Sequence, residues 1–207
     1  MRAVLAAWLL SLLWVLPAAA DRLVVVELYT SQGCSSCPPA DALLMELRER
    51  DDVLPLALHV DYWDYIGWKD EFARPEFTER QKAYAYAAGH RTIYTPQMIV
   101  GGVDHMVGNK PMKLAALIET HGDKASVIDV EIARQGDRVV ISARAQGQAP
   151  ARMTVQLVRY NPVETVEIRR GENAGRTITY GNIVTEWRPL AQWDGRTPIE
   201  LVAEAPG

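Results

Sequence analysis

Cysteine is scarce in this sequence: its 207 residues include only two, Cys34 and Cys37. Two cysteines form at most one disulfide, which cannot be the framework of a small secreted domain, so the class of disulfide-rich scaffold proteins is excluded. Only Ser35 and Ser36 separate the two, and no odd thiol is left over. The sequence therefore predicts one dithiol or disulfide pair.

Two further features are missing, an excess of positive charge and a long apolar run beyond the N-terminus. The chain carries 22 Lys and Arg against 26 Asp and Glu, a formal net charge of −4. This balance argues against nucleic acid as a partner. No segment after residue 20 is apolar enough to span a bilayer, and there is no internal repeat or low-complexity stretch. With 48% apolar residues, the chain has material for one large or two small cores.

The N-terminus has the pattern of a secretory signal peptide. Arg2 precedes an apolar run over residues 3–16, which Pro17 and three alanines follow. The run is shorter than the about 20 residues of a spanning helix, and small residues suit a cleavage site after Ala20. An uncleaved anchor is the alternative. We expect a periplasmic or secreted protein, and outside the cytosol a disulfide can persist.

A strand, a helix and a second strand are expected after the signal peptide. Residues 23–29 are rich in β-branched and aliphatic side chains, which is typical of a buried strand. Apolar side chains recur at helical spacing over residues 40–50. Pro38 and Pro39 suit the first turn of this helix, because the N–H groups of a first turn have no partner within the helix. Residues 53–61 are the second apolar run. This order predicts parallel strands with a crossover helix, and it puts the cysteines at the helix N-terminus.

The next elements follow from the same spacing and turn signals. We expect an aromatic-rich loop, a helix, a Gly-Gly hairpin of two strands and a further helix, which are assigned to residues 62–74, 75–88, 97–107 and 110–121. The aromatic side chains of residues 62–68 either form a lid over the following helix or a surface that recognises a substrate.

The pattern changes to short strands from residue 125 onward. Helix signals stop near residues 122–126, where we place a domain boundary. The expected strands are residues 127–133, 138–145, 153–160, 163–168, 183–187 and 199–203. The sequence thus predicts an α/β domain over residues 21–123 and an all-β, sandwich-like domain over residues 124–207.

The position of the cysteines suits thiol chemistry. A helix N-terminus lowers the pKa of a nearby thiol, and the thiolate is the nucleophile. Cys34 is placed to attack a disulfide, and Cys37 is placed to resolve the mixed disulfide that results. We expect no cofactor, and the expected partner is a protein or a small thiol that carries a thiol or disulfide.

The elements and motifs resemble a known family. The order from the first strand to the Thr95-Pro96 hairpin is similar to the thioredoxin fold over about residues 23–122. Four stretches more closely resemble DUF1223, a family of secreted thioredoxin-like proteins of uncharacterised function; they are residues 26–38, 61–65, 94–98 and 170–177. This resemblance implies a fold and a redox site, and it supplies no activity.

The resemblance also implies roles for three residues besides the cysteines. Thioredoxin-like proteins have a cis-proline that faces the disulfide, and the matching pair here is Thr95 and Pro96. They also bury an acid beneath the dithiol, and the matching strand residue is Glu27 when the following loop is one residue longer. A buried Glu27 would exchange a proton with Cys37; a strand-end glutamate that faces water is the alternative.

Other interpretations of the motifs stay open. The disulfide is either redox-active or a permanent clip. A Cu(I) site made of the two cysteines and one of His59, His90 or His105 is a further hypothesis, because thiolates favour Cu(I). Residues 169–176 form either a hairpin turn, with left-handed positions at Gly171, Asn173 and Gly175, or a basic docking patch. The leading hypothesis is an exported thiol-disulfide oxidoreductase.

Overall fold

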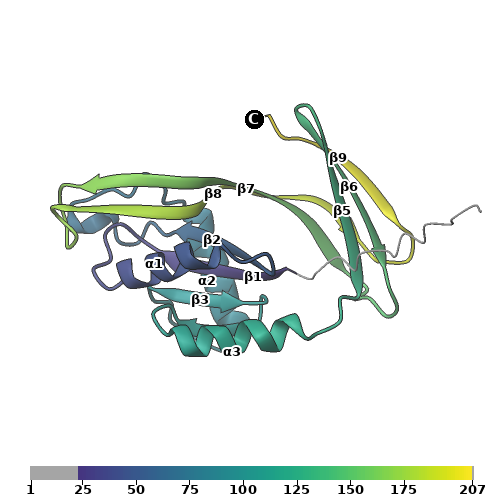
Figure 1. Cartoon of the computed structure of the whole chain (residues 1–207), viewed down its shortest axis with the longest axis horizontal. Coiled ribbons are helices and arrows are strands. Elements are labelled where there is room, and N and C mark those ends of the chain that lie inside the picture. The colour runs from purple at the N-terminus through teal and green to yellow at the C-terminus, as the bar shows by residue number, and fades with distance from the viewer. Residues whose placement is uncertain (1–22, 207) are drawn as a thin grey trace, which may run out of the picture.

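The computed structural model describes residues 23–206 (Figure 1). The expected signal peptide and its cleavage site after Ala20 lie outside these residues. Within the described range, no helix is both long and apolar enough to cross a membrane.

A six-stranded sheet forms the centre of the protein, with the strand order β4-β3-β1-β2-β8-β7. β1 and β2 are parallel over their whole length, from the Val24–Val53 pair to the Thr30–His59 pair. The first part of the chain supplies β1 (Val24–Thr30), α1 (Pro38–Leu47), β2 (Val53–His59), η1 (Asp64–Ile66), α2 (Pro75–Ala87), β3 (Gln97–Val100), β4 (Asp104–Val107) and α3 (Pro111–Gly122). These bounds lie within a few residues of those predicted from the sequence.

The two faces of β1 belong to different cores, because successive side chains of a strand point to opposite faces. Val24, Val26 and Leu28 pack with residues of α1 and α3. Tyr29 lies on the other face, in a cluster with Phe77 of α2. The sheet therefore separates α1 and α3 from α2, and this division determines which strand residues can reach the disulfide.

The strands after residue 124 are divided between two sheets. β7 (Met153–Ile168) and β8 (Arg176–Trp193) form a long antiparallel hairpin, and β8 pairs in parallel with β2 at Ala57 and Ile183. The expected all-β segment thus completes the central sheet as well as forming a sheet of its own. Turn signals reveal strands in a sequence, but they do not reveal the partner of each strand.

β7 is one 16-residue strand where the sequence predicted two. Pro162 lies between the two predicted strands, and proline cannot donate to a strand ladder. β7 lies at the edge of the sheet, where a proline is tolerated, and the pairing shifts its register between Arg159 and Tyr160. The strand therefore continues through the proline.

The remaining strands form a separate three-stranded sheet in the order β5-β6-β9. Its strands are β5 (Ile128–Gln135), β6 (Arg138–Ala145) and β9 (Ile199–Glu204). In Figure 1 this sheet stands at the end of the β7–β8 hairpin that lies away from α1.

Candidate functional site

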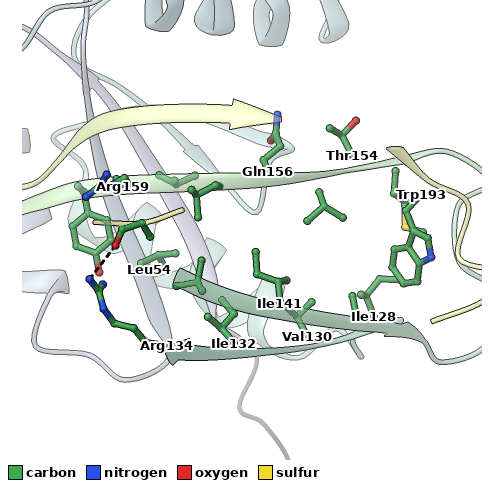
Figure 2. Close-up of a pocket in the computed structure, with 18 of the residues that line it drawn as sticks. Leu54, Ile128, Val130, Ile132, Arg134, Ile141, Thr154, Gln156, Arg159 and Trp193 are labelled. Carbon is green, nitrogen blue, oxygen red and sulfur yellow. Dashed lines mark hydrogen bonds between the residues drawn. The ribbon is translucent and has the colours of Figure 1, made fainter. Parts of the chain in front are cut away.

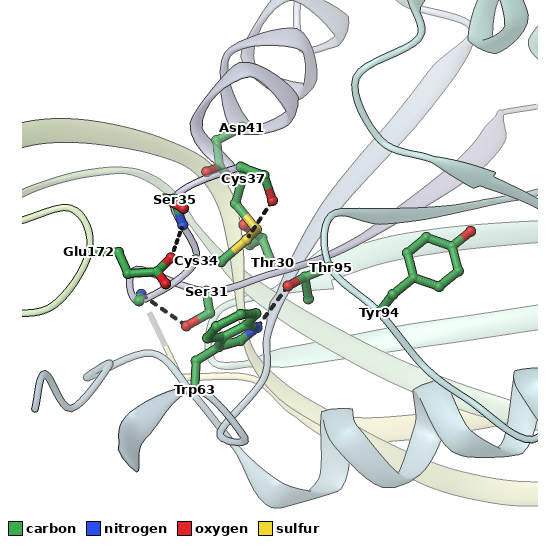
Figure 3. Close-up of a disulfide and its surroundings, with 12 residues drawn as sticks. Thr30, Ser31, Cys34, Ser35, Cys37, Asp41, Trp63, Tyr94, Thr95 and Glu172 are labelled. Carbon is green, nitrogen blue, oxygen red and sulfur yellow. Dashed lines mark hydrogen bonds between the residues drawn. A yellow bond between two sulfur atoms is a disulfide. The ribbon is translucent and has the colours of Figure 1, made fainter. Parts of the chain in front are cut away.

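Cys34 and Cys37 form a disulfide at the start of α1, with Cα atoms 5.4 Å apart (Figure 3). Cys37 is the N-cap residue of α1, and Pro38 opens the helix. The two prolines fit there because the first helical N–H groups have no partner within the helix. The structure thus confirms the predicted position of the pair at a helix N-terminus.

Both cysteines are buried: Cys34 is 1% exposed and Cys37 is fully enclosed. Part of the cover comes from Trp63, whose indole N–H donates to Thr95 Oγ1 over 2.8 Å. Gly33 lets this cover approach, because a Cβ there would lie 3.1 Å from Trp63 Cβ and from the end of Ile66. A large side chain in place of Gly33 would collide with the loop that carries Trp63 and Ile66.

The Thr95–Pro96 peptide bond is cis, which confirms the prediction for this pair. Thr95 lies beside the disulfide in Figure 3. Pro96 lies near the start of α1, since a Cβ added to Gly108 would come within 3.1 Å of Pro96 and 3.0 Å of Ala40. The two residues expected to face the disulfide are therefore brought to its side of the sheet.

Glu27 is buried, but it lies on the α2 face of the sheet. Its carboxylate accepts two hydrogen bonds of 2.8 Å from Arg80 and one each from the hydroxyls of Tyr29 and Tyr84. The Arg80 guanidinium also stacks over Trp187 of β8, 3.7 Å from the ring centroid. Because β1 alternates its faces, Glu27 points away from α1, and the expected placement of this acid beneath the dithiol is not what the structure has.

Asp41 is the buried acid next to the disulfide. It follows Cys37 by one helical turn, and Thr30 Oγ1 donates to its Oδ1 over 2.7 Å. Burial raises the pKa of Asp41 to about 7, although the nearby His59 and the hydrogen bond from Thr30 oppose the rise. Figure 3 shows Asp41 and Trp63 on opposite sides of the disulfide. The i+4 spacing of Asp41 from Cys37 is the signal in the sequence that could have identified this acid.

The turn between β7 and β8 holds the disulfide loop. Asn173 Nδ2 donates to the carbonyl oxygens of Gln32 and Cys34, each over 2.9 Å. The backbone N–H of Ser35 donates to Glu172 over 3.2 Å. Hydrogen bonding with the Ser35 side chain and with this N–H lowers the pKa of the Glu172 carboxyl.

This segment is the predicted hairpin turn, with one correction. Gly171 and Gly175 have positive φ angles of 78° and 81°, as expected. Asn173 is not among the residues with positive φ. It is buried, and its contribution is the pair of hydrogen bonds that its side chain donates. No local signal in the sequence shows that this turn contacts Cys34.

His59 is fully buried, and its Nδ1 lies 2.7 Å from Asp70 Oδ2. The other two histidines considered for a Cu(I) site lie together, with His90 and His105 ring centroids 6.0 Å apart, and His105 contacts Gln97. Among residues 23–206, no group of three or more His, Cys, Asp or Glu is arranged to hold a metal ion.

A cavity of about 730 Å³ lies between β7 and the three-stranded sheet (Figure 2). Its walls are mostly apolar, and they include Ile128, Ile141 and Trp193, with Arg134 and Arg159 at one end. No lining residue comes from the disulfide loop or from α1. The cavity has the size of a small-molecule site and is separate from the disulfide.

The fold and the site define a mixed α/β protein with a buried Cys-x-x-Cys disulfide at a helix start. A family model described as "protein of unknown function (DUF1223)" matches residues 25–207. The chain therefore belongs to the DUF1223 family, as its motifs indicated. The comparison with curated proteins gives no match.

Several solved structures match this chain. A crystal structure of a protein from Agrobacterium tumefaciens is 33% identical, with a TM-score of 0.78 over 90% of this chain and 81% of the other. HBP35 of Porphyromonas gingivalis is 15% identical, with a TM-score of 0.63 over 90% of this chain and 64% of the other. A thioredoxin of Malassezia sympodialis is 20% identical and has a TM-score of 0.32 over 50% of this chain and 80% of the other, which is too low to support an argument about the fold.

Proposed function

We propose that this protein is an exported thiol-disulfide oxidoreductase whose redox group is the Cys34–Cys37 disulfide and whose residues 21–123 form a thioredoxin-like unit. The observation that carries this proposal is the position of the pair at the N-terminus of α1, beside the cis-peptide at Pro96. The positive end of the helix dipole stabilises a thiolate there. Export is inferred from the signal-like pattern of residues 1–20.

The chemistry is a pair of thiol-disulfide exchanges. In the reduced protein, the Cys34 thiolate attacks a substrate disulfide, which releases one substrate thiol and leaves a mixed disulfide. The Cys37 thiol then loses its proton and attacks the Cys34 sulfur. This step releases the second substrate thiol and restores the Cys34–Cys37 disulfide, so two electrons pass to the substrate; the reverse sequence oxidises a substrate dithiol.

Asp41 is the group we propose as proton acceptor for Cys37, in place of Glu27. It is buried, it lies one turn along the helix from Cys37, and its pKa is raised to about 7. A carboxylate with this pKa can take the proton of a thiol near neutral pH, because general bases work best when their pKa lies near the working pH.

The buried sulfurs require the loop that carries Trp63 to move before a substrate can reach Cys34. The loop is joined to Thr95 by hydrogen bonds from the Trp63 indole and from the Tyr62 side chain. The substrate is accordingly a thiol or disulfide that can enter once Trp63 is displaced.

Trapping tests the function directly. The Cys37→Ser variant, expressed with its own N-terminal segment, lacks the resolving thiol, so Cys34 should accumulate mixed disulfides that non-reducing gels and mass spectrometry identify. The matched control is the Cys34→Ser variant, which should trap little. If neither variant forms adducts and the wild-type pair resists reduction, the oxidoreductase proposal fails.

A permanent structural disulfide is the second candidate, and the burial of both sulfurs favours it. Such a clip would close a very short loop, which stabilises a fold less than a long one. Under this alternative, Cys34→Ser/Cys37→Ser would lower the free energy of unfolding, and no mixed disulfide would form with the single variants.

A further inference from the structure

Among the buried polar atoms that lack a hydrogen-bond partner within the described part of the chain, three belong to side chains that meet on the α1 face of the sheet. They are Asp41 Oδ2, His59 Nε2 and the hydroxyl of Tyr180. Buried polar atoms are rarely left unpaired in folded proteins, so a group of them at one place requires an explanation. Each comes from a different element: α1, β2 and β8.

The sheet brings these side chains to one place. Thr30 and His59 are partners in the parallel β1–β2 pair, so their side chains lie on the same face, and Thr30 donates to Asp41. The rings of His59 and Tyr180 meet edge to face with centroids 4.9 Å apart. Asp41 and His59 are close enough that each charge moves the pKa of the other.

Asp70 completes the group from the loop before α2. Its Oδ2 accepts from His59 Nδ1 and from the backbone N–H of Gln32, two residues before Cys34. Burial alone would lower the pKa of His59, but the charge and hydrogen bond of Asp70 outweigh it and raise that pKa. Burial alone would raise the pKa of Asp70, but His59 and the backbone N–H groups lower it. Both directions favour an imidazolium-carboxylate pair.

We propose that the buried His59–Asp70 pair, which packs against Tyr180, positions Asp41 and favours its charged form so that it can take the proton of Cys37. This inference rests on the proposed redox function. The positive imidazolium favours the carboxylate form of Asp41, which otherwise would be neutral in so buried a place. His59 and Asp70 are thus positioning residues that act through Asp41.

The proton balance of the step is simple. When Cys37 resolves a mixed disulfide on Cys34, its proton moves to the Asp41 carboxylate, and the leaving substrate thiolate takes a proton from water. Asp41 later returns its proton to solvent or, in the reverse reaction, to Cys37. His59 stays protonated throughout, so its charge is constant while Asp41 cycles.

The pH dependence of this step is set by every group that faces Asp41 or the His59–Asp70 pair. Besides that pair, the titratable and charged groups come from α1, from β8 and from η1; they are Cys37, Tyr180, Arg176 and Asp64. Among residues 23–206, the polar neighbour that β1 supplies to the Asp41 carboxylate is the uncharged Thr30.

The test compares wild type with His59→Gln, which removes the imidazolium. We expect the titration midpoint of Asp41, followed by the carboxyl ¹³C shift in the disulfide form, to rise by at least about one pH unit, a tenfold change in proton affinity. If the single variant does not fold, His59→Gln/Asp70→Asn removes both charges together and should give a smaller rise in the same direction. The matched control is His121→Gln, because His121 forms a pair of equal length, 2.7 Å, with Asp104 elsewhere.

A second readout separates this inference from the function on which it rests. The reoxidation rate of the reduced protein by oxidised glutathione is measured from pH 5 to 9, and its midpoint should move upward with that of Asp41. If the wild-type pair does not react, the proposed function fails and this inference with it. If the wild type reacts but both midpoints are unchanged in the variants, the inference alone is overturned.

Discussion

Asn173 supports the disulfide loop from the far end of the β7–β8 turn. Its amide group supplies two hydrogen bonds to backbone carbonyl oxygens, one of them that of Cys34. The bonded residues are 141 and 139 positions apart in the sequence, so these bonds exist only in the folded chain. Asn173 thus couples the shape of the Cys-x-x-Cys loop to the long hairpin.

Truncation of this side chain is expected to be costly. Asn173→Ala removes both buried hydrogen bonds, so the Gln32 carbonyl oxygen loses this donor and the Cys34 carbonyl oxygen keeps only the Cys37 N–H; we predict a loss of about 1–3 kcal/mol in the free energy of unfolding. Urea unfolding measures it, and Glu172→Ala, which removes an exposed neighbour, should cost less than about 0.5 kcal/mol. Equal losses in the two variants would show that Asn173 has no special role.

Asp41 gives the stability a characteristic pH dependence. Its pKa is raised from 3.8 to about 7 in the folded protein, so the folded chain holds a proton between these values that the unfolded chain has lost. The free energy of unfolding therefore falls as the pH rises from about 4 through about 7. Asp41→Asn should be more stable than wild type at pH 8 by on the order of 2–4 kcal/mol, and similar to it at pH 4.

Urea unfolding of both proteins at the two pH values checks this expectation. Asp51→Asn is the matched control, because Asp51 is an exposed carboxylate near the end of the same helix. The control should show the same dependence on pH as the wild type. If the difference in free energy of unfolding between Asp41→Asn and wild type is the same at pH 4 and pH 8, Asp41 does not titrate as described.

At the scale of elements, the loop from β2 to α2 acts as a cover for the disulfide. Trp63 is hydrogen-bonded to Thr95 and packs against Gly33, and Trp68 Nε1 donates to Gln32 Oε1. Tyr65 stacks on Trp63 with ring centroids 6.5 Å apart, but it is 81% exposed. The tryptophans make the contacts that close the site, while Tyr65 faces solvent.

Removal of the cover should make the disulfide more reactive. Trp63→Ala deletes the indole and its hydrogen bond, so we predict that dithiothreitol reduces the disulfide at least about tenfold faster, as a barrier lowered by about 1.4 kcal/mol would allow. Stopped-flow or alkylation-quench kinetics give the rate. Tyr65→Ala is the control and should change it little; an unchanged rate in Trp63→Ala would mean that this loop does not restrict access.

Several elements could be predicted because their signals are local. Pro38 and Pro39 begin α1, Gly101 and Gly102 make a turn with positive φ, and apolar runs define β1 and β2. The role of Glu27 could not be predicted in this way. The residue pattern shows that Glu27 lies in a buried strand, but it does not show to which face of the sheet Glu27 points. In the structure Glu27 bonds Arg80 on the α2 face, and the acid at the disulfide is Asp41 of α1.

At the scale of the molecule, β8 makes the C-terminal part of the chain a structural part of the central sheet. Ile183 pairs with Ala57 of β2, and Val184 belongs to the same cluster as Tyr29 and Phe77. The expected boundary near residue 123 therefore does not coincide with a boundary between sheets. Such long-range pairing leaves no local signal, which explains why the sequence showed strands without their partners.

Residues 21–123 are consequently not expected to fold alone. Each side chain of β8 such as Ile183 or Val184 contributes about 1.5–3 kcal/mol by burial, and a few of them equal the whole stability of a typical domain. We predict that residues 21–123 give a poorly dispersed amide NMR spectrum, while residues 21–207 give a dispersed one. A native-like spectrum of the shorter chain would show that the first unit is independent.

The equilibrium reduction potential of the Cys34–Cys37 pair tests the redox function most directly. It is measured on the folded chain in dithiothreitol and glutathione buffers, with the free thiols quantified by alkylation. The account predicts reversible reduction without unfolding, at a potential between about −120 and −270 mV, the range of known disulfide oxidoreductases. A potential below about −300 mV, or reduction only when the protein unfolds, would contradict the account and identify the pair as a permanent clip.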